Sequence, residues 1–234
     1  MRRIKQLHVI VPVHDEEHLL PRCLAAIGRA VEEVRRRPRA PAVDVTVVLD
    51  ACTDDSALVA RRAGVRTVRI AAREVGQARA AGVADAVARV GGGPPTAIWI
   101  ANTDADSCVP ASWLTAQLDL ARDGFELMVG RVRPDRSELA DEVVSLWWRR
   151  HRAPVRMPVH GANLGFSLAA YQRAGGYPAV GEHEDVALVR AAIDAGCRWT
   201  QAGPWVSTSG RLHGRVAGGF AGYLRTLAAE PDPA

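Results

Sequence analysis

The sequence predicts an α/β fold with a mostly parallel central sheet flanked by helices. Short apolar runs typical of buried strands alternate with segments whose apolar residues have helical spacing, which is the pattern of parallel strands joined by crossover helices. Acidic residues follow three of these runs directly, as Asp15, Asp50 and Asp104. Because parallel strands end at one edge of a sheet, we expect the three carboxylates to share one polar crevice, where open α/β sheets bind ligands.

The first half of the chain divides into strand and helix units. Strands are expected at residues 7–13, 43–49, 65–70 and 97–101, and helices at 18–34, 57–63, 76–90 and 111–123. Turn residues separate the units, as in the run from Gly91 to Pro95 before the last of these strands. No glycine-rich phosphate loop follows any strand, which argues against a dinucleotide dehydrogenase or a P-loop enzyme.

The second half is less regular. We expect a strand at 127–132, a helix at 138–151, a glycine-bearing turn at 160–163 that leads into a short strand, and a helix next to the acidic run 182–185. The 138–151 helix has Leu139, Val143 and Trp147 at four-residue steps. It either contacts a membrane surface or an acceptor, or packs its tryptophans into the core, and the second arrangement is favoured.

Composition limits the class of protein. The 234 residues include 30 basic and 26 acidic side chains, a net charge of +4, and no basic and aromatic motif typical of nucleic-acid binding, so we expect no nucleic-acid partner. The four cysteines are scattered, which favours free thiols in a cytoplasmic protein over a zinc site or a disulfide framework. We expect no signal peptide, and no apolar segment approaches the roughly 20 residues that span a bilayer.

Asp104 and Asp106 leave the end of the expected strand 97–101 together. Carboxylate oxygens are the ligands that Mg²⁺ and Mn²⁺ prefer, and these ions can also hold substrate phosphates. A solvated turn is the alternative explanation for this pair taken alone, because Asp and Asn are common turn residues.

Five motifs in order resemble those of the family 2 glycosyltransferases, which have the GT-A fold, and the chain looks like a small bacterial member. They are the opening strand 9–16, the run 47–56 that is similar to VVDDGSTD, the helix 76–82, Asp104-Ala105-Asp106, and Glu184-Asp185. Residues 207–211 also resemble an end motif of some small members. The chain departs from the family pattern where Asp15 replaces Asn, Leu49 replaces Asp, and Ala51 replaces Gly.

This resemblance implies the domain organisation and the substrates. A single GT-A domain would cover residues 1–234, with a nucleotide-sugar half at 1–110, an acceptor and catalytic half at 111–227, and a tail at 228–234 that we expect to be disordered. The donor would be a UDP- or GDP-sugar, and transfer would depend on Mn²⁺ or Mg²⁺. The acceptor and the oligomeric state are left open, and peripheral contact with the inner face of the membrane is compatible with the sequence.

The resemblance also implies roles on the donor side. Asp106 would bind the metal, and Asp104 would reach the ribose or a water on the metal. His213, in the glycine- and arginine-rich segment 207–227, is a candidate for a third metal ligand, with a mobile surface position as the alternative.

The nucleotide itself would be bound by the first motifs. Asp50 would read the base through an N–H group, and Pro12 and Asp15 would shape the base and ribose pocket. Asp15 could instead cap the helix that follows it. Arg79 would pair with phosphate or with Asp50, or it would be a surface arginine of its helix.

The late acidic pair would carry the chemistry. An acceptor hydroxyl is a poor nucleophile until a base removes its proton. The family pattern gives this role to Asp185, with Glu184 orienting the acceptor or a nearby loop, and direct displacement would invert the anomeric centre. Acids at a helix N-terminus also stabilise the helix whatever the function, which is the alternative explanation.

Three other functions stay open at this point. A nucleotidyltransferase would use similar acids but needs a basic phosphate loop, and the first strand is instead followed by the acidic run 14–17. A phosphatase with Asp104 as nucleophile lacks a lysine partner, since Lys5 is the only lysine. A sugar-nucleotide binding protein without catalysis would explain the departures at Leu49, Ala51 and Ala81.

Overall fold

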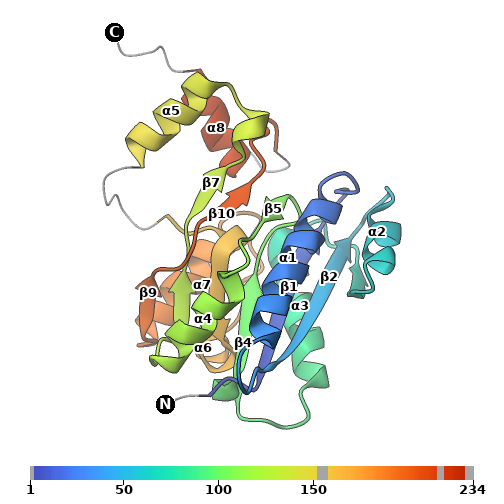
Figure 1. Cartoon of the computed structure of the whole chain (residues 1–234), viewed down its shortest axis with the longest axis vertical. Helices are drawn as coiled ribbons and strands as arrows, with labels where there is room; N and C mark the ends of the chain where they lie inside the picture. The colour runs from blue at the N-terminus through green and yellow to red at the C-terminus, as the bar shows by residue number, and fades with distance from the viewer. Residues whose placement is uncertain (1–2, 152–157, 215–218, 230–234) are drawn as a thin grey trace.

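The main body of the protein is a seven-stranded sheet, seen in a computed structural model that describes residues 3–151, 158–214 and 219–229 (Figure 1). The strand order is β3-β2-β1-β4-β8-β6-β9; β3, β2, β1 and β4 are parallel, and β8 is antiparallel to both of its neighbours. The bounds are Gln6–Val13 (β1), Ala42–Asp50 (β2), Arg66–Ile70 (β3), Ile98–Asn102 (β4), Leu127–Val129 (β6), Leu164–Ser167 (β8) and Trp199–Gln201 (β9).

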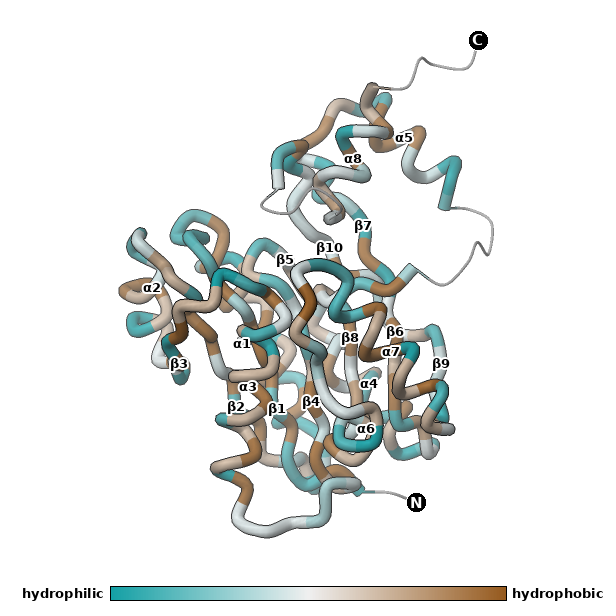
Figure 2. Tube along the Cα trace, turned by 180° about the vertical axis from the view of Figure 1, so that it is seen from behind, coloured by the Kyte–Doolittle hydropathy of each residue, from teal (hydrophilic) through white to brown (hydrophobic). Residues whose placement is uncertain are grey.

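Helices cover both faces of this sheet, which Figures 1 and 2 view in turn. One face carries α1 (Leu20–Arg35), α2 (Ser56–Arg62) and α4 (Trp113–Arg122), and the other carries α3 (Val75–Arg89), α6 (Leu168–Arg173) and α7 (Glu184–Asp194). Alternate side chains of β1 enter the two cores, such as Val9 on one face and Ile10 on the other. A strand buried on both faces reads as a continuous apolar run, and this explains the sequence of β1.

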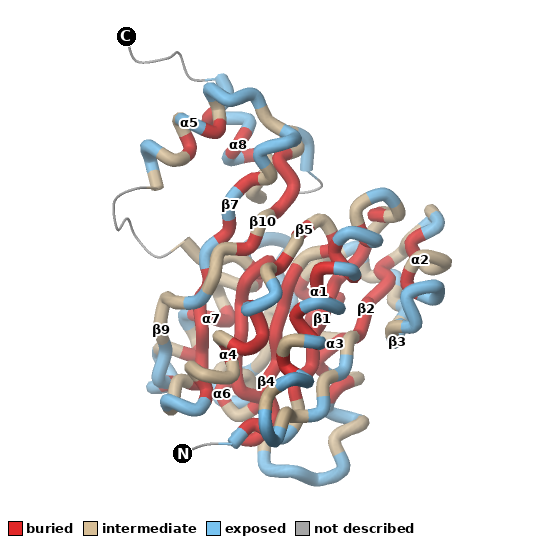
Figure 3. The backbone as a smooth tube through the Cα atoms, viewed as in Figure 1, coloured by how far each residue is buried: buried red, intermediate tan, exposed pale blue. Residues whose placement is uncertain are grey.

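A smaller sheet joins the main body to a separate lobe. Its strands are β5 (Ser107–Cys108), β10 (Val206–Thr208) and β7 (Val132–Pro134), with β10 in the middle. The lobe consists of η2 (Arg136–Glu138), α5 (Asp141–Arg150) and α8 (Phe220–Ala228), and its core contains the buried side chains of Trp147, Leu224 and Leu227. Figures 1 and 3 show that the lobe projects beyond the sheet and contains fewer buried residues than the main body.

The strands and helices predicted for residues 7–123 are confirmed, with every boundary within two residues of the prediction. The four cysteines are free, as expected. Among the described helices, none combines the length and the apolar character needed to cross a membrane.

The second half differs from the prediction in several places, and α6, β9 and β10 were not predicted. The strand expected at 127–132 is two strands in different sheets. Between them, the side chain of Asn163 donates to the backbone carbonyl oxygen of Arg131 at 2.8 Å, and a Cβ at Gly130 would lie 2.2 Å from Cγ of Asn163. The helix expected at 138–151 begins only at Asp141, after η2, and Trp147 is buried as favoured. The helix α8 was not predicted, and it ends at Ala228, which the sequence placed in a disordered tail; residues 230–234 of that tail lie outside the described part of the chain.

Candidate active site

A cavity of about 1350 Å³ opens at the carboxyl ends of β1, β2 and β4, and residues of both the main body and the lobe line it. Its lining includes Asp50, Asp104, Asp106, Glu184 and Asp185. The first three follow parallel strands and the last two begin α7, so motifs far apart in the sequence meet around one space. The polar crevice expected from the strand ends is present, although Asp15 is not part of its lining.

Arg79, on α3, links Asp104 to Glu184. Its Nη2 donates to Oδ1 of Asp104 at 2.6 Å, and its Nη1 donates to Oε1 of Glu184. The side chains of Arg79 and Glu184 are only 4% and 5% exposed, whereas Asp104 is 34% exposed. Arg79 is therefore neither a surface arginine nor a partner of Asp50, which corrects two of the three alternatives drawn from the sequence.

Two glycines leave the space that this buried ion pair needs. A Cβ at Gly161 would lie 2.2 Å from Nη2 of Arg79, and a Cβ at Gly76 would lie 2.9 Å from Cγ of Glu184. Burial lowers the pKa of Arg79, but the charge of Asp104, together with that of Glu184, outweighs burial and keeps the guanidinium charged. Burial raises the pKa of Glu184, and Arg79 offsets part of that rise.

Asp106 lies at the start of the smaller sheet and contacts the C-terminal part of the chain. Its Oδ2 accepts from Nη2 of Arg211 at 2.8 Å, and its Oδ1 accepts from Oγ1 of Thr208 at 3.2 Å. The guanidinium of Arg211 also donates to both carboxylate oxygens of Glu16, at 2.9 and 3.2 Å. Burial and the nearby charge of Asp104 raise the pKa of Asp106 to about 6, even though Arg211 acts in the opposite direction.

Asp50 ends β2 and is 3% exposed. Its two oxygens accept from the backbone N–H groups of Arg73 and Glu74, at 2.8 and 2.9 Å, and thereby fix the loop between β3 and α3. A carboxylate has about four acceptor positions, so Asp50 can still accept from a ligand in the cavity. His14 contacts the backbone carbonyl oxygen of Asp50 through Nδ1 at 2.6 Å, and both residues line the cavity together with Pro12.

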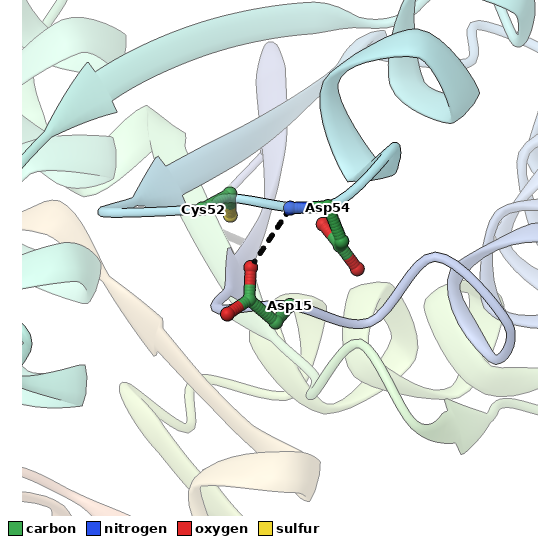
Figure 4. A group of neighbouring side chains, drawn as sticks. All are labelled: Asp15, Cys52 and Asp54. Carbon is green, nitrogen blue, oxygen red and sulfur yellow. Dashed lines mark hydrogen bonds between the residues drawn. The ribbon is translucent and has the colours of Figure 1, made fainter.

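Asp15 faces the loop after β2 instead of the cavity. Its Oδ1 accepts from the backbone N–H of Thr53 at 2.7 Å and from that of Asp54 at 3.2 Å. Figure 4 shows the second of these bonds. It does not cap α1, whose N-cap residue is Leu19 and has no side-chain cap. Asp15, Cys52 and Asp54 bring one ligand atom each within 4.8 Å of one another, and the backbone hydrogen bonds of Asp15 account for this arrangement.

Asp185 lies in the first turn of α7 and lines the cavity. Its Oδ2 accepts from the backbone N–H of Gly161 at 2.7 Å, and its Oδ1 accepts from the N–H of Val186 at 2.7 Å. These bonds fix the orientation of the carboxylate at the edge of the cavity. His160, just before Gly161, also lines the cavity, and burial lowers its pKa, so it is neutral near pH 7.

The donor set of Asp104 and Asp106 fits a divalent metal ion. Both line the cavity and offer hard oxygen atoms, the ligand type that Mg²⁺ and Mn²⁺ prefer. His213 is exposed and does not belong to the described lining of the cavity, although Arg211 and Gly214 on either side of it do. Its role as a third ligand stays a prediction.

Two site residues were not identified as partners from the sequence. Glu16 was seen only as the end of the opening motif, and Arg211 as part of an end motif and a phosphate contact. Their pairing joins residues 195 positions apart, and no local pattern signals a contact over such a distance. The one sign of this pairing is that Glu16 is a buried acid near the end of β1 and close to other acids, so a cation is needed beside it.

Comparison with known proteins gives a family and a set of structural neighbours. The sequence model of the family described as "Glycosyl transferase family 2" matches residues 8–175. No curated protein matches the sequence. Residues 1–349 of S. aureus TarS, solved in complex with UDP-GlcNAc, superpose with a TM-score of 0.65 at 12% identity, over 92% of this chain and 61% of that one.

Two further neighbours are similar in the same way. The mannosyltransferase PcManGT from Pyrobaculum calidifontis, in complex with GDP-Man and Mn²⁺, has a TM-score of 0.63 at 20% identity and covers 91% of this chain and 58% of its own. The M. tuberculosis glucosyl-3-phosphoglycerate synthase has a TM-score of 0.53 at 17% identity, with 96% and 78% covered. At these identities the neighbours establish a common fold, and this chain spans less than two thirds of TarS and of PcManGT.

Proposed function

Because the chain belongs to glycosyl transferase family 2, we propose that it transfers a sugar from a UDP- or GDP-sugar to an acceptor hydroxyl, with inversion at the anomeric carbon. The GT-A fold implied by the sequence is confirmed by the sheet and its neighbours. One observation carries the proposal: the acid pair after β4 and the carboxylate of Asp185 line the same cavity. The neighbours solved with UDP-GlcNAc and with GDP-Man support the class of donor.

The donor side of the cavity is the edge formed by β1, β2 and β4. Pro12, His14 and Asp50 line it and would receive the nucleoside, with Asp50 accepting from an N–H group of the base. Arg211 would contact the diphosphate, because its guanidinium lies beside Asp106. Residues 1–110 would thus bind most of the donor and residues 111–227 the acceptor.

Asp106 and Asp104 would hold Mn²⁺ or Mg²⁺. Once bound, this ion would neutralise the negative charge of the leaving diphosphate. We expect that Asp106→Ala abolishes the dependence of UDP affinity on Mn²⁺, because the alanine offers no oxygen ligand. Calorimetric titration of UDP with and without Mn²⁺ measures this, and an Mn²⁺ effect of parental size in the variant would contradict the assignment.

Asp185 would act as the base. One of its oxygens takes the proton of the acceptor hydroxyl while the hydroxyl oxygen forms a bond to the anomeric carbon and the bond from that carbon to the diphosphate oxygen breaks. Arg79 would hold Glu184 and Asp104 in place on either side, so that donor and base keep a fixed relation. The free thiols of the four cysteines fit a cytoplasmic location.

The decisive experiment measures turnover and stereochemistry. UDP- and GDP-sugars are incubated with the protein and Mn²⁺, and release of nucleotide is followed first without an acceptor. We expect Asp185→Asn to bind UDP as the parent does and to lose about 10²–10⁴ in the rate of transfer, because the amide cannot take up the proton. NMR of the first product should show the inverted anomer. A retained anomer, or near-parental turnover of Asp185→Asn, would exclude Asp185 as the base, and absence of any turnover with intact UDP binding would favour a non-catalytic binding protein.

A further inference from the structure

The two sides of the cavity differ in the charge of their side chains. Eight carboxylates line it, and all of them come from the sheet edge, the start of α3 or the start of α7. The lobe and the residues next to β7 and β10 contribute Arg131 and Arg150 and no carboxylate among the described lining residues of this side. The other lining arginines, Arg73, Arg79 and Arg211, lie among the carboxylates. We define the lobe wall as Arg131, Arg150, His151, Trp205, Phe220 and Tyr223.

The rings of the lobe wall are held in fixed orientations by Trp147, which is 1% exposed. His151 stacks on Trp147 with ring centroids 4.1 Å apart, and Trp205 meets it edge-on at 5.7 Å. Tyr223 in turn meets His151 edge-on at 5.9 Å. A ring whose orientation is set by its neighbours loses little conformational entropy when a ligand packs on it, so this wall is suited to binding.

Arginine and aromatic side chains are combined on this wall. The guanidinium of Arg131 lies over the ring of Trp205, 5.1 Å from its centroid, and Arg150 ends the helix that carries Trp147. Aromatic rings pack on flat apolar faces, such as the C–H face of a sugar, while guanidinium groups pair with phosphate and carboxylate. A neutral acceptor would use only the rings, whereas an acceptor with an anionic group would also pair with the guanidinium groups of this wall.

We propose that the acceptor carries a phosphate or carboxylate group beside a sugar ring or a similar polyol, that Arg131 and Arg150 bind the anion, and that Trp205 and Tyr223 bind the carbon face. This rests on the proposed transferase function and names the class of acceptor. The hydroxyl of such an acceptor would face Asp185, which lines the same cavity. The negative charge of the acceptor would be kept away from the acids that hold the donor.

A lipid surface is the competing partner for a basic and aromatic lobe. Among the described residues, the large exposed apolar side chains are Val87, Val180, Trp199 and Tyr223, and only Tyr223 belongs to the lobe. A surface that inserts into a bilayer presents a continuous apolar face, which the described part of the lobe does not have. The small anionic acceptor is therefore favoured.

Calorimetry on the full chain saturated with UDP and Mn²⁺ tests the proposal, because the donor side is then filled. The probes are three matched pairs: glucose 6-phosphate and glucose, glycerol 3-phosphate and glycerol, and glucuronate and glucose. We expect at least one anionic probe to bind about tenfold or more tightly than its neutral partner, as charge-assisted hydrogen bonds give such factors. In the double variant Arg131→Gln/Arg150→Gln this difference should fall to within about threefold.

Matched controls are available on the same elements. Arg133 on β7 and Arg149 on α5 are exposed and lie outside the lining of the cavity, so Arg133→Gln/Arg149→Gln should keep the full preference for the anionic probe. No preference in any pair, an equal loss in this control, or weaker UDP binding in Arg131→Gln/Arg150→Gln would overturn the proposal. The proposal would also be overturned if the protein sedimented with anionic vesicles in a way that depends on Arg131 and Arg150, while no anionic probe bound more tightly than its neutral partner. Failure of the parent to bind UDP would instead contradict the proposed function itself.

Discussion

Replacing Arg79 by Met tests whether the buried ion pair holds the site together. Methionine keeps most of the volume of the side chain and removes its charge, so the effect reports on electrostatics more than on packing. Glu184, at 5% exposure, would be left as a buried carboxylate without a cation, whereas Asp104, at 34% exposure, can be solvated. Breaking a buried pair by removing one partner costs about 3–5 kcal/mol, so we expect a loss of that size in the free energy of unfolding.

Urea unfolding followed by circular dichroism measures this loss as a shift in the midpoint at constant slope. A double variant, Arg79→Met/Glu184→Gln, removes the stranded charge as well and should recover about 2 kcal/mol or more of the loss. The control Arg66→Met removes an arginine that pairs with Asp85 while being 48% exposed, and it should cost less than about 1 kcal/mol. If Arg79→Met costs no more than Arg66→Met, or the double variant recovers nothing, the buried pair does not have the role assigned to it.

Three further predictions follow from local geometry. Gly161→Ala should cost about 1–3 kcal/mol and also slow transfer, because a Cβ would displace the Arg79 guanidinium, and a thermal melt together with the transferase assay shows whether both change. Ala51 has φ of 49°, so Ala51→Gly should stabilise the protein by about 0.5–1 kcal/mol in urea unfolding, and destabilisation would contradict the strain. Folding raises the pKa of Asp106 from 3.8 to about 6, so its contribution to stability is complete below about pH 4 and is lost as the pH rises through 6. In the presence of a chelator, the unfolding free energy of the parent relative to that of Asp106→Asn should therefore fall by about 1–3 kcal/mol between pH 4 and pH 7.5. A rise in this difference would contradict the sign.

The central sheet could be predicted because its signals are local. A strand buried on both faces is apolar along its whole length, and the helices between the strands have a regular apolar spacing, as β1 and α1 show. Asp104, Asp106 and Asp185 could be proposed as site residues because they follow the end of a strand or begin a helix. The cavity brings all three together.

The contacts between distant segments could not be predicted in the same way. Arg79 was assigned to a helix correctly, but its partners depend on how α3 packs against α7 and the end of β4. The short strands β5, β7 and β10 have two or three residues each, too few for a period of two to be visible. The lobe was not predicted because α5 and α8 form its small core, and most of the second half of the chain lies between these two helices.

The pairing of Arg211 with Glu16 also sets an order of events during synthesis of the chain. Glu16 is synthesised before its cation, which follows 195 residues later, so the acids around Asp106 remain without this counter-charge until Arg211 has been made. Bringing these ends together carries the entropy cost of a long loop, and contacts of this kind form late in folding. The parallel strands β1 to β4 pair within residues 6–102, so they can form before Arg211 is available. The charge balance of the site can therefore be completed only after the strands that carry Asp50, Asp104 and Asp106 have been made.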